Sequence, residues 1–183
     1  MLKIAPHPDT PVMAYEKNLM ETEVSCMRLV AEKASVPLPK VQYSDFSCTI
    51  CNAPYFFMEK INGKSLSPQQ DSMSDEEINA IYRKTGNLNK QINAITNSFF
   101  GYPSQVEFQG KNWQDVFMKM LKTMTLDMQK AKISVAISID EMFALLEKDR
   151  DVFAEVTMLS LVHWDIWDGN IFVKNNKITG IID

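Results

Sequence analysis

The chain has 183 residues, of which 45% are hydrophobic and 23% charged, proportions typical of a globular protein with one sizeable core or two small ones. A net charge of −4 without any Lys/Arg-rich run argues against nucleic acid as a partner. No apolar run approaches the roughly 20 residues of a membrane span and no signal-peptide pattern follows Met1, so we expect a cytoplasmic protein without a membrane partner.

The beginning of the chain predicts a strand followed by a helix. The apolar run at residues 2–5 is interrupted by Lys3, which a strand would place on the face opposite its apolar neighbours. Residues 14–31 then repeat apolar side chains at helical spacing, with Glu23 on or beside that stripe. Pro37 and Pro39 end the helix and start an extended segment.

Further strands are expected before residue 64. Residues 41–43 and 48–50 are predicted to pair across a turn, and residues 54–63 form an aromatic strand that runs into a second turn. Cys48 and Cys51 have the spacing of a metal or redox pair, but no second Cys or His pair accompanies them. We therefore expect reduced thiols.

The pattern changes from strands to helices after a polar linker at residues 65–72. Ser74-Asp75-Glu76-Glu77 is a capping box that opens a helix with a buried stripe of about five turns. A second helix is expected from Asn112, and a third opens with Ser138-Ile139-Asp140-Glu141 and continues through residues 152–153. Their Met-rich stripes are interpreted as core.

The last segment, residues 160–183, carries the residues most typical of a reaction centre. His163, Asp165 and Asn170 have the spacing H-x-D-x-x-x-x-N, which is also the spacing of the phosphoryl-transfer loop of kinases. In that pattern the Asp lies beside the acceptor hydroxyl and the Asn binds Mg²⁺. A polar turn that closes a strand is the alternative interpretation.

A hairpin is predicted directly after this loop. Residues 171–173 and 177–182 alternate like strands, and Asn175-Asn176 between them favours a turn with left-handed backbone conformations. Such a hairpin would bring Asp183 back beside Asn170. In the kinase pattern an Asp at this place binds Mg²⁺ together with the nucleotide phosphates.

The run H-W-D-I-W-D-G-N-I-F-V, followed by I-T-G-I-I-D, resembles the catalytic segment of the aminoglycoside phosphotransferase and choline kinase-like family, and the similarity extends from Leu2 to Asp183. The resemblance implies an α+β, protein-kinase-like fold of two lobes, with residues 1–63 as part of the N-lobe and residues 64–183 as part of the C-lobe. The family's glycine-rich hairpin and its later C-lobe helices have no counterpart here. A partial or truncated chain is therefore expected, and activity of these residues alone is not implied.

The same resemblance implies a nucleotide site. Lys3 and Glu23 would form the pair that holds the α- and β-phosphates of ATP, although a near-terminal charge and a solvated helix face are the alternatives. Backbone groups at Glu59 to Ile61 would bind the adenine edge, and Phe57 or Met58 would line its pocket. An ordinary core strand is the alternative for this segment. His163 is expected to brace the catalytic loop through hydrogen bonds.

The expected function is an ATP- and Mg²⁺-dependent phosphotransferase that acts on a hydroxyl of a small molecule. Aminoglycoside, choline-like, homoserine-like and sugar acceptors all remain open. Trp164 and Trp167 flank Asp165 and either stack on a sugar or cation or pack inward. A non-catalytic kinase-like binding module, or an inactive truncated fragment, is the alternative function.

Overall fold

The computed structural model describes residues 1–183, which divide into two compact units. The first unit comprises Met1–Pro8, Glu23–Thr96 and Ser160–Asp183, and the second comprises Asp9–Thr22 and Asn97–Leu159. Each unit is described by itself below. None of the helices is long and apolar enough to cross a membrane.

The first unit contains a three-stranded antiparallel sheet with the strand order β1-β3-β2. These strands are β1 (Leu2–Ile4), β2 (Val41–Asp45) and β3 (Tyr55–Met58). Lys3 lies opposite Phe56 in the β1–β3 register, so both side chains share one face of the sheet. Phe56 is fully buried on that face, whereas Leu2 and Ile4 are exposed. The inward face of β1 is therefore the face that carries its lysine.

The prediction of a strand at residues 48–50 is wrong. The Asp45 carboxylate accepts hydrogen bonds from the backbone nitrogen and the hydroxyl of Ser47, at 2.8 and 2.6 Å, and these bonds turn the chain out of the sheet. Cys48 follows with a positive φ of 57°. Residues 46–54 thus form a loop, and β2 pairs with β3 instead.

Helix α1 (Leu19–Lys33) begins later than the periodicity predicted. A short 3₁₀-helix, η1 (Ala14–Glu16), precedes it, and Asn18 separates the two with a φ of 55°. Asn tolerates this left-handed conformation better than most residues, so it interrupts a pattern that is otherwise periodic. The helix ends before Pro37, as predicted.

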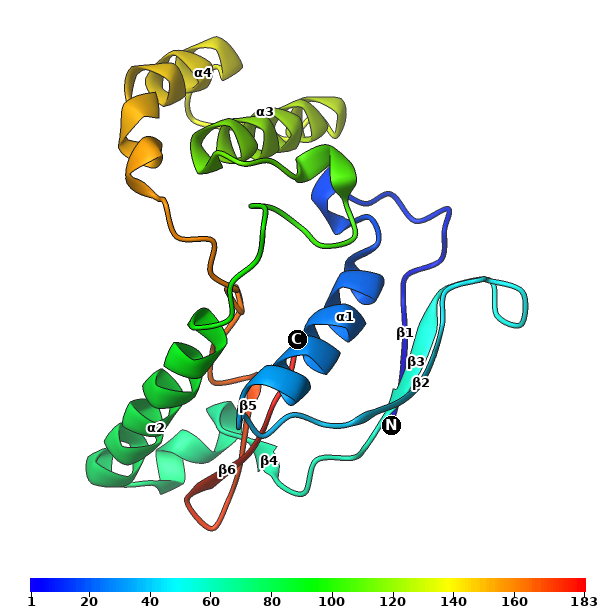
Figure 1. The fold of residues 1–183 in the computed structure, drawn as a ribbon, viewed down its shortest axis with the longest axis vertical. Helices are drawn as coiled ribbons and strands as arrows, with labels where there is room; N and C mark the ends of the chain where they lie inside the picture. Colours follow the sequence, from blue (N-terminus) through cyan, green and yellow to red (C-terminus); the bar gives the residue numbers. More distant parts are fainter. The chain divides into compact units, whose positions relative to one another are not determined.

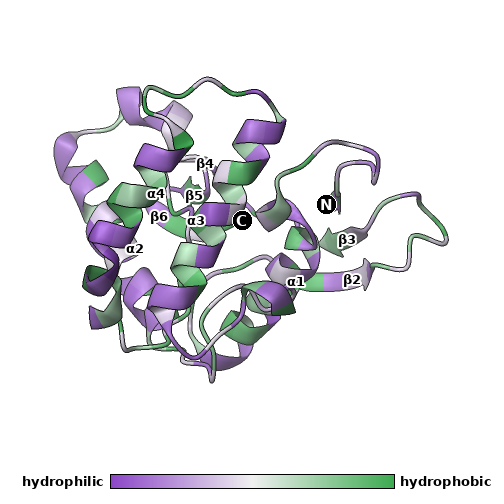
Figure 2. Cartoon of the chain, turned by 90° about the horizontal axis from the view of Figure 1, so that it is seen from above, coloured by the Kyte–Doolittle hydropathy of each residue, from purple (hydrophilic) through white to green (hydrophobic).

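Helix α2 (Asp75–Asn93) begins with the predicted capping box: Ser74 accepts from the backbone of Glu77, and the Glu77 side chain accepts from the backbone of Ser74. Hydrophilic and hydrophobic residues alternate along the helix in Figure 2. Its fully buried stripe consists of Ile81, Thr85, Leu88 and Ile92, which follow the helical period.

The second sheet of this unit is formed by β4, β5 and β6 in that order (Figure 1). β5 (Ile171–Lys174) and β6 (Lys177–Ile181) form the predicted hairpin, with Asn175 and Asn176 at φ values of 49° and 59°. The expected polar linker is more structured than predicted, because it contains β4 (Lys64–Ser65) and the 3₁₀-helix η2 (Ser67–Ser72). β4 pairs with β5, a contact across more than 100 residues that local patterns do not reveal.

Two apolar clusters hold the hairpin and the loop before it. One contains Val30, Val36, Leu88, Ile92 and Ile181, and the other contains Leu66, Ile81, Ile171 and Val173. Ile166 packs against both clusters. Since Ile166 immediately follows Asp165, the core holds the predicted catalytic loop at one point.

The second unit contains α3 (Trp113–Lys130), α4 (Ile139–Lys148) and the 3₁₀-helices η3 (Val106–Phe108) and η4 (Arg150–Glu155). Asn112 caps α3 and the predicted capping box caps α4. The third helix was predicted too long, because α4 ends at Lys148 and the chain continues after Asp149 as η4. This change of geometry lets Phe153 pack on Phe117, with ring centroids 4.5 Å apart.

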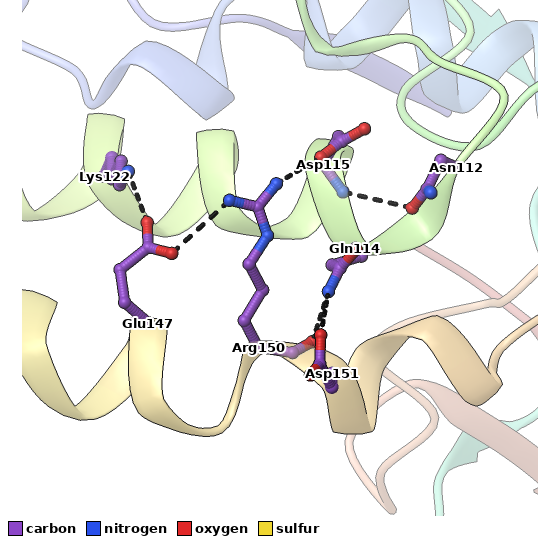
Figure 3. Close-up of polar contacts among 7 residues, drawn as sticks. All are labelled: Asn112, Gln114, Asp115, Lys122, Glu147, Arg150 and Asp151. Carbon is purple, nitrogen blue, oxygen red and sulfur yellow. Dashed lines mark hydrogen bonds and ion pairs between the residues drawn. The ribbon is translucent and has the colours of Figure 1, made fainter.

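Polar contacts join α3 to the α4–η4 segment (Figure 3). Arg150 donates to Asp115 at 2.6 Å and to Glu147 at 3.4 Å, and Lys122 donates to Glu147 at 2.9 Å. These side chains are all exposed, so water and salt screen the pairs and each contributes little to stability. The aromatic contact beneath them is the larger stabilising term.

Candidate active site

Three predicted site residues from distant parts of the chain meet at the Lys3 ammonium group. Nζ of Lys3, on β1, donates to both carboxylate oxygens of Glu23, on α1, at 2.8 and 2.9 Å. The same ammonium group also donates to Oδ1 of Asp183, which follows β6. The predicted strand-to-helix pair is thus formed, and it connects directly to the carboxylate at position 183.

Electrostatics favour a charged pair here. Burial lowers the pKa of Lys3, but hydrogen bonds to Asp183 and Glu23 outweigh that effect and the pKa lies above its ordinary value. Burial raises the pKa of Glu23 above its ordinary value, and the hydrogen bonds and charge of Lys3 offset only part of that effect. One ammonium group binds both oxygens of Glu23, an arrangement that favours the charged form of the carboxylate.

Asp165 and Asn170 form the second part of the site. The Asn170 side-chain nitrogen donates to the backbone carbonyl and to Oδ2 of Asp165, both at 3.0 Å. Asn170 is buried, with 6% of its surface exposed, whereas Asp165 is exposed. The backbone nitrogen of Ile182 donates to the Asn170 carbonyl at 3.1 Å, so the hairpin brings the end of β6 beside Asn170, as predicted.

His163 enters the loop after an antiparallel bridge between Ser160 and Thr96 rather than from a regular strand. Its Nδ1 atom is buried without a hydrogen-bond partner, so the expected bracing hydrogen bond is not formed at this nitrogen. Burial lowers the pKa of the imidazole, while the charges of Asp165 and Asp183 raise it by smaller amounts. The imidazole is therefore neutral at physiological pH.

Some backbone groups of the segment expected to bind adenine already form hydrogen bonds within the protein. Met58 is buried and exchanges backbone hydrogen bonds with Met1, and the Glu59 backbone nitrogen donates to the Lys40 carbonyl at 3.0 Å. No hydrogen bond engages the Glu59 carbonyl or the Ile61 backbone nitrogen. Both groups are therefore free to bind a ligand edge.

The two tryptophans beside Asp165 do not pack inward. Trp164 is 70% and Trp167 is 56% exposed. Trp164 has a φ of 74°, an uncommon conformation for a bulky residue and one that is found at functional sites. A Cβ at Gly169 would lie 2.1 Å from the Trp167 ring, so the glycine leaves the space that this ring occupies.

Comparison with known proteins identifies the family. The model of the phosphotransferase enzyme family matches residues 2–183. The chain belongs to the phosphotransferase enzyme family. Among curated proteins, none matches this chain significantly.

Two solved structures show the fold. A protein of Ralstonia eutropha JMP134, provisionally described as an aminoglycoside phosphotransferase, has a TM-score of 0.58 at 18% identity, over 91% of this chain and 50% of its own. The ADP-bound aminoglycoside phosphotransferase APH(2'')-Ib has a TM-score of 0.55 at 17% identity, over 100% of this chain and 64% of its own. The chain therefore has the predicted α+β, kinase-like fold, and it spans between half and two thirds of these relatives' lengths.

Asn170 and Asp183 provide the donor chemistry that Mg²⁺ prefers. The Asn170 amide oxygen and the Asp183 carboxylate are hard oxygen ligands, and no hydrogen bond engages Oδ1 of Asn170. No group of three or more His, Cys, Asp or Glu side chains gathers to hold a metal by itself. Two protein ligands suit Mg²⁺, since it commonly completes its coordination with water and substrate phosphates.

Sequence reasoning missed Asp168, which lies in the loop between Asp165 and Asn170. Its carboxylate accepts hydrogen bonds from Gln70 and Tyr82, at 2.6 and 3.0 Å. Asp-Gly-Asn is typical of a polar turn, and nothing local indicates partners in η2 and α2. The lobe boundary expected near residue 63 stays a prediction.

Proposed function

We propose that the protein transfers the γ-phosphoryl group of ATP to a hydroxyl group of a small molecule. The observation that carries this proposal is the arrangement of Lys3, Glu23 and Asp183, joined through one ammonium group, in a family whose members are phosphotransferases. The bound nucleotide in APH(2'')-Ib, which is ADP, supports nucleotide use. The cytoplasm, where thiols such as the three free cysteines stay reduced, is the proposed location.

The nucleotide side of the reaction is assigned to residues around Lys3. Its ammonium group can bind phosphate oxygens while Glu23 fixes its position. The free carbonyl of Glu59 and the free backbone nitrogen of Ile61 are proposed to bind the base, next to the buried Met58. Asn170 and Asp183 would hold Mg²⁺, which neutralises phosphate charge when bound.

The acceptor side is assigned to Asp165. Its carboxylate is exposed, while the hydrogen bond from Asn170 fixes its orientation. A carboxylate in this state can accept the proton of an approaching hydroxyl group. Aminoglycoside, choline-like, homoserine-like and sugar hydroxyls are all proposed acceptors, and the exposed rings of Trp164 and Trp167 would suit a sugar or a cation.

The experiment compares Asp165→Asn with Asp183→Asn by measuring Mg²⁺-ATP binding and, with a panel of acceptors, ADP release. Asp165→Asn should keep nucleotide binding and lower kcat by ~10²-fold or more, the scale expected when a positioned base is removed. Asp183→Asn should weaken Mg²⁺-ATP binding, and added Mg²⁺ should recover part of the loss. Asp140→Asn, a change of an exposed residue on α4, is the control.

Three outcomes would contradict the proposal or one of its assignments. No Mg²⁺-ATP binding at millimolar concentration would exclude this class of enzyme. Binding of ATP without release of ADP for any acceptor would instead identify a kinase-like binding module. If Asp165→Asn abolished nucleotide binding, the assignment of Asp165 to the acceptor would be wrong.

A further inference from the structure

Asp168 is the most highly connected residue of the loop between Asp165 and Asn170. Oδ2 of Asp168 accepts from Nε2 of Gln70 at 2.6 Å and from the Tyr82 hydroxyl at 3.0 Å. Gln70 donates its other amide hydrogen to the Tyr82 hydroxyl at 2.9 Å. Both amide hydrogens and the hydroxyl hydrogen are thus used, and the three side chains form a closed, satisfied triangle.

The backbone of Asp168 is held as well. Its carbonyl accepts from the backbone nitrogen of Ser67 and from the hydroxyl of Ser65, both at 3.1 Å. Residue 168 is therefore joined to β4, η2 and α2 at once. These three elements precede the loop by 86 to 103 residues in sequence.

We propose that Asp168 is a positioning residue that fixes the loop from Asp165 to Asn170 for phosphoryl transfer. The proposal rests on the proposed function. The loop has two anchors: Ile166 in the apolar core and Asp168 in the polar triangle. Asp165 precedes the first anchor and Asn170 follows the second, so both reacting side chains stay within two residues of a fixed point.

The chemistry of the anchor explains why a carboxylate suits this position. One oxygen receives two hydrogen bonds from neutral donors, and a negative charge strengthens both. The hydrogen bond to Asp168 is also the main cause that raises the pKa of Tyr82. A carboxylate with its oxygen occupied in this way is a poor candidate for a proton acceptor, which separates Asp168 from the more open Asp165.

The test uses Asp168→Ala, Asp168→Asn and Tyr82→Phe in the protein, with Asp71→Ala as a matched control, since Asp71 is an exposed aspartate of η2. Asp168→Ala should lower kcat about tenfold or more, because Asp165 is misplaced, and should raise the KM for Mg²⁺-ATP by a smaller factor, because Asn170 follows the same anchor. Asp168→Asn keeps an acceptor oxygen and should recover part of the loss. Asp71→Ala should behave as the wild type.

Amide hydrogen exchange supplies a readout that does not need activity. In Asp168→Ala, peptides that cover residues 163–170 should exchange faster, while peptides from α2 stay protected. If Asp168→Ala fails to fold, Tyr82→Phe, which removes one hydroxyl from a 43% exposed side chain, carries the same two measurements.

Unchanged kcat or unchanged loop exchange in a folded variant would overturn the proposal, and so would an equal rise in exchange throughout α2. A wild-type protein that transfers no phosphoryl group would overturn the proposed function instead. In that case the exchange measurement alone would decide whether Asp168 fixes the loop.

Discussion

The side-chain nitrogen of Asn170 binds two oxygens of Asp165, the backbone carbonyl and Oδ2, each at 3.0 Å. The proposed metal ligand therefore also orients the proposed proton acceptor. The Asn170 oxygen stays available because only its nitrogen is used. A single amide thus links the nucleotide side of the site to the acceptor side.

Asn170→Ala is expected to impair both stability and rate. It removes the donor to Oδ2 and leaves a buried cavity, which should cost about 1–2 kcal/mol of unfolding free energy. Without this hydrogen bond the Asp165 carboxylate loses its fixed orientation, and kcat should fall by about tenfold or more. Urea unfolding and steady-state kinetics measure the two effects. Asn62→Ala, at an exposed residue that binds only Lys174, is the control, and a full wild-type kcat in Asn170→Ala would refute the coupling.

Lys3→Met should destabilise the protein by leaving the Glu23 carboxylate without its partner. The Glu23 side chain is only 16% exposed, but that of Lys3 is 35% exposed, so the loss is expected near 1–2 kcal/mol rather than the larger value of a fully buried pair. Lys33→Met breaks an exposed pair with Glu32 and should change stability by less than about 0.5 kcal/mol. Thermal unfolding of both variants checks the contrast, which equal losses would contradict.

The pH dependence of stability should contain a contribution from His163. Burial lowers its pKa in the folded protein below the ordinary value of 6.5, so below that pH the unfolded chain binds more protons than the folded one. Stability should therefore be fully present above pH 6.5 and decrease as the pH falls from there toward the folded-state pKa. Unfolding free energies at about pH 7.5 and 5.5 measure this decrease. The unfolding free energy of His163→Gln should fall less between these pH values than that of the wild type. Equal decreases in the two proteins would exclude a contribution from His163.

Gly86→Ala and Gly101→Ala should change stability in opposite directions. Gly86 lies within α2, and a Cβ there would have no neighbour within 4 Å, so the substitution should stabilise the helix by about 0.5–1 kcal/mol. Gly101 has a φ of 108°, and its Cβ would lie 1.8 Å from the Phe108 carbonyl oxygen. Gly101→Ala should therefore lower the unfolding free energy by more than about 2 kcal/mol. Denaturant midpoints measure both, and a stabilised Gly101→Ala would refute the steric reasoning.

Local signals predicted the elements whose causes lie within a few residues. The capping box from Ser74 to Glu77 and the Asn175-Asn176 turn each depend on contacts between near neighbours, so the sequence alone indicated them. The H-x-D-x-x-x-x-N spacing assigned Asp165 and Asn170 to one loop, and in the structure a hydrogen bond joins their side chains.

Predictions were wrong where one polar side chain redirects the backbone. Asp45 binds Ser47 and turns the expected strand at residues 48–50 into a loop, although the residues there alternate like a strand. Asn18 interrupts the first helix in the same way. The ties from Asp168 to Gln70 and Tyr82 depend on tertiary structure, so no local pattern could indicate them.

The bond between Lys3 and Asp183 joins positions separated by 180 residues. Closing so large a loop has an entropy cost that only the finished fold can offset, so this contact is expected to form late during folding. During synthesis, Lys3 and Glu23 emerge long before their partner exists, and Glu23 must remain hydrated or pair with Lys3 alone. The cluster of Lys3, Glu23 and Asp183 thus forms only after β6 has been synthesised, and a nascent chain that lacks β6 would fold its first sheet without this cluster.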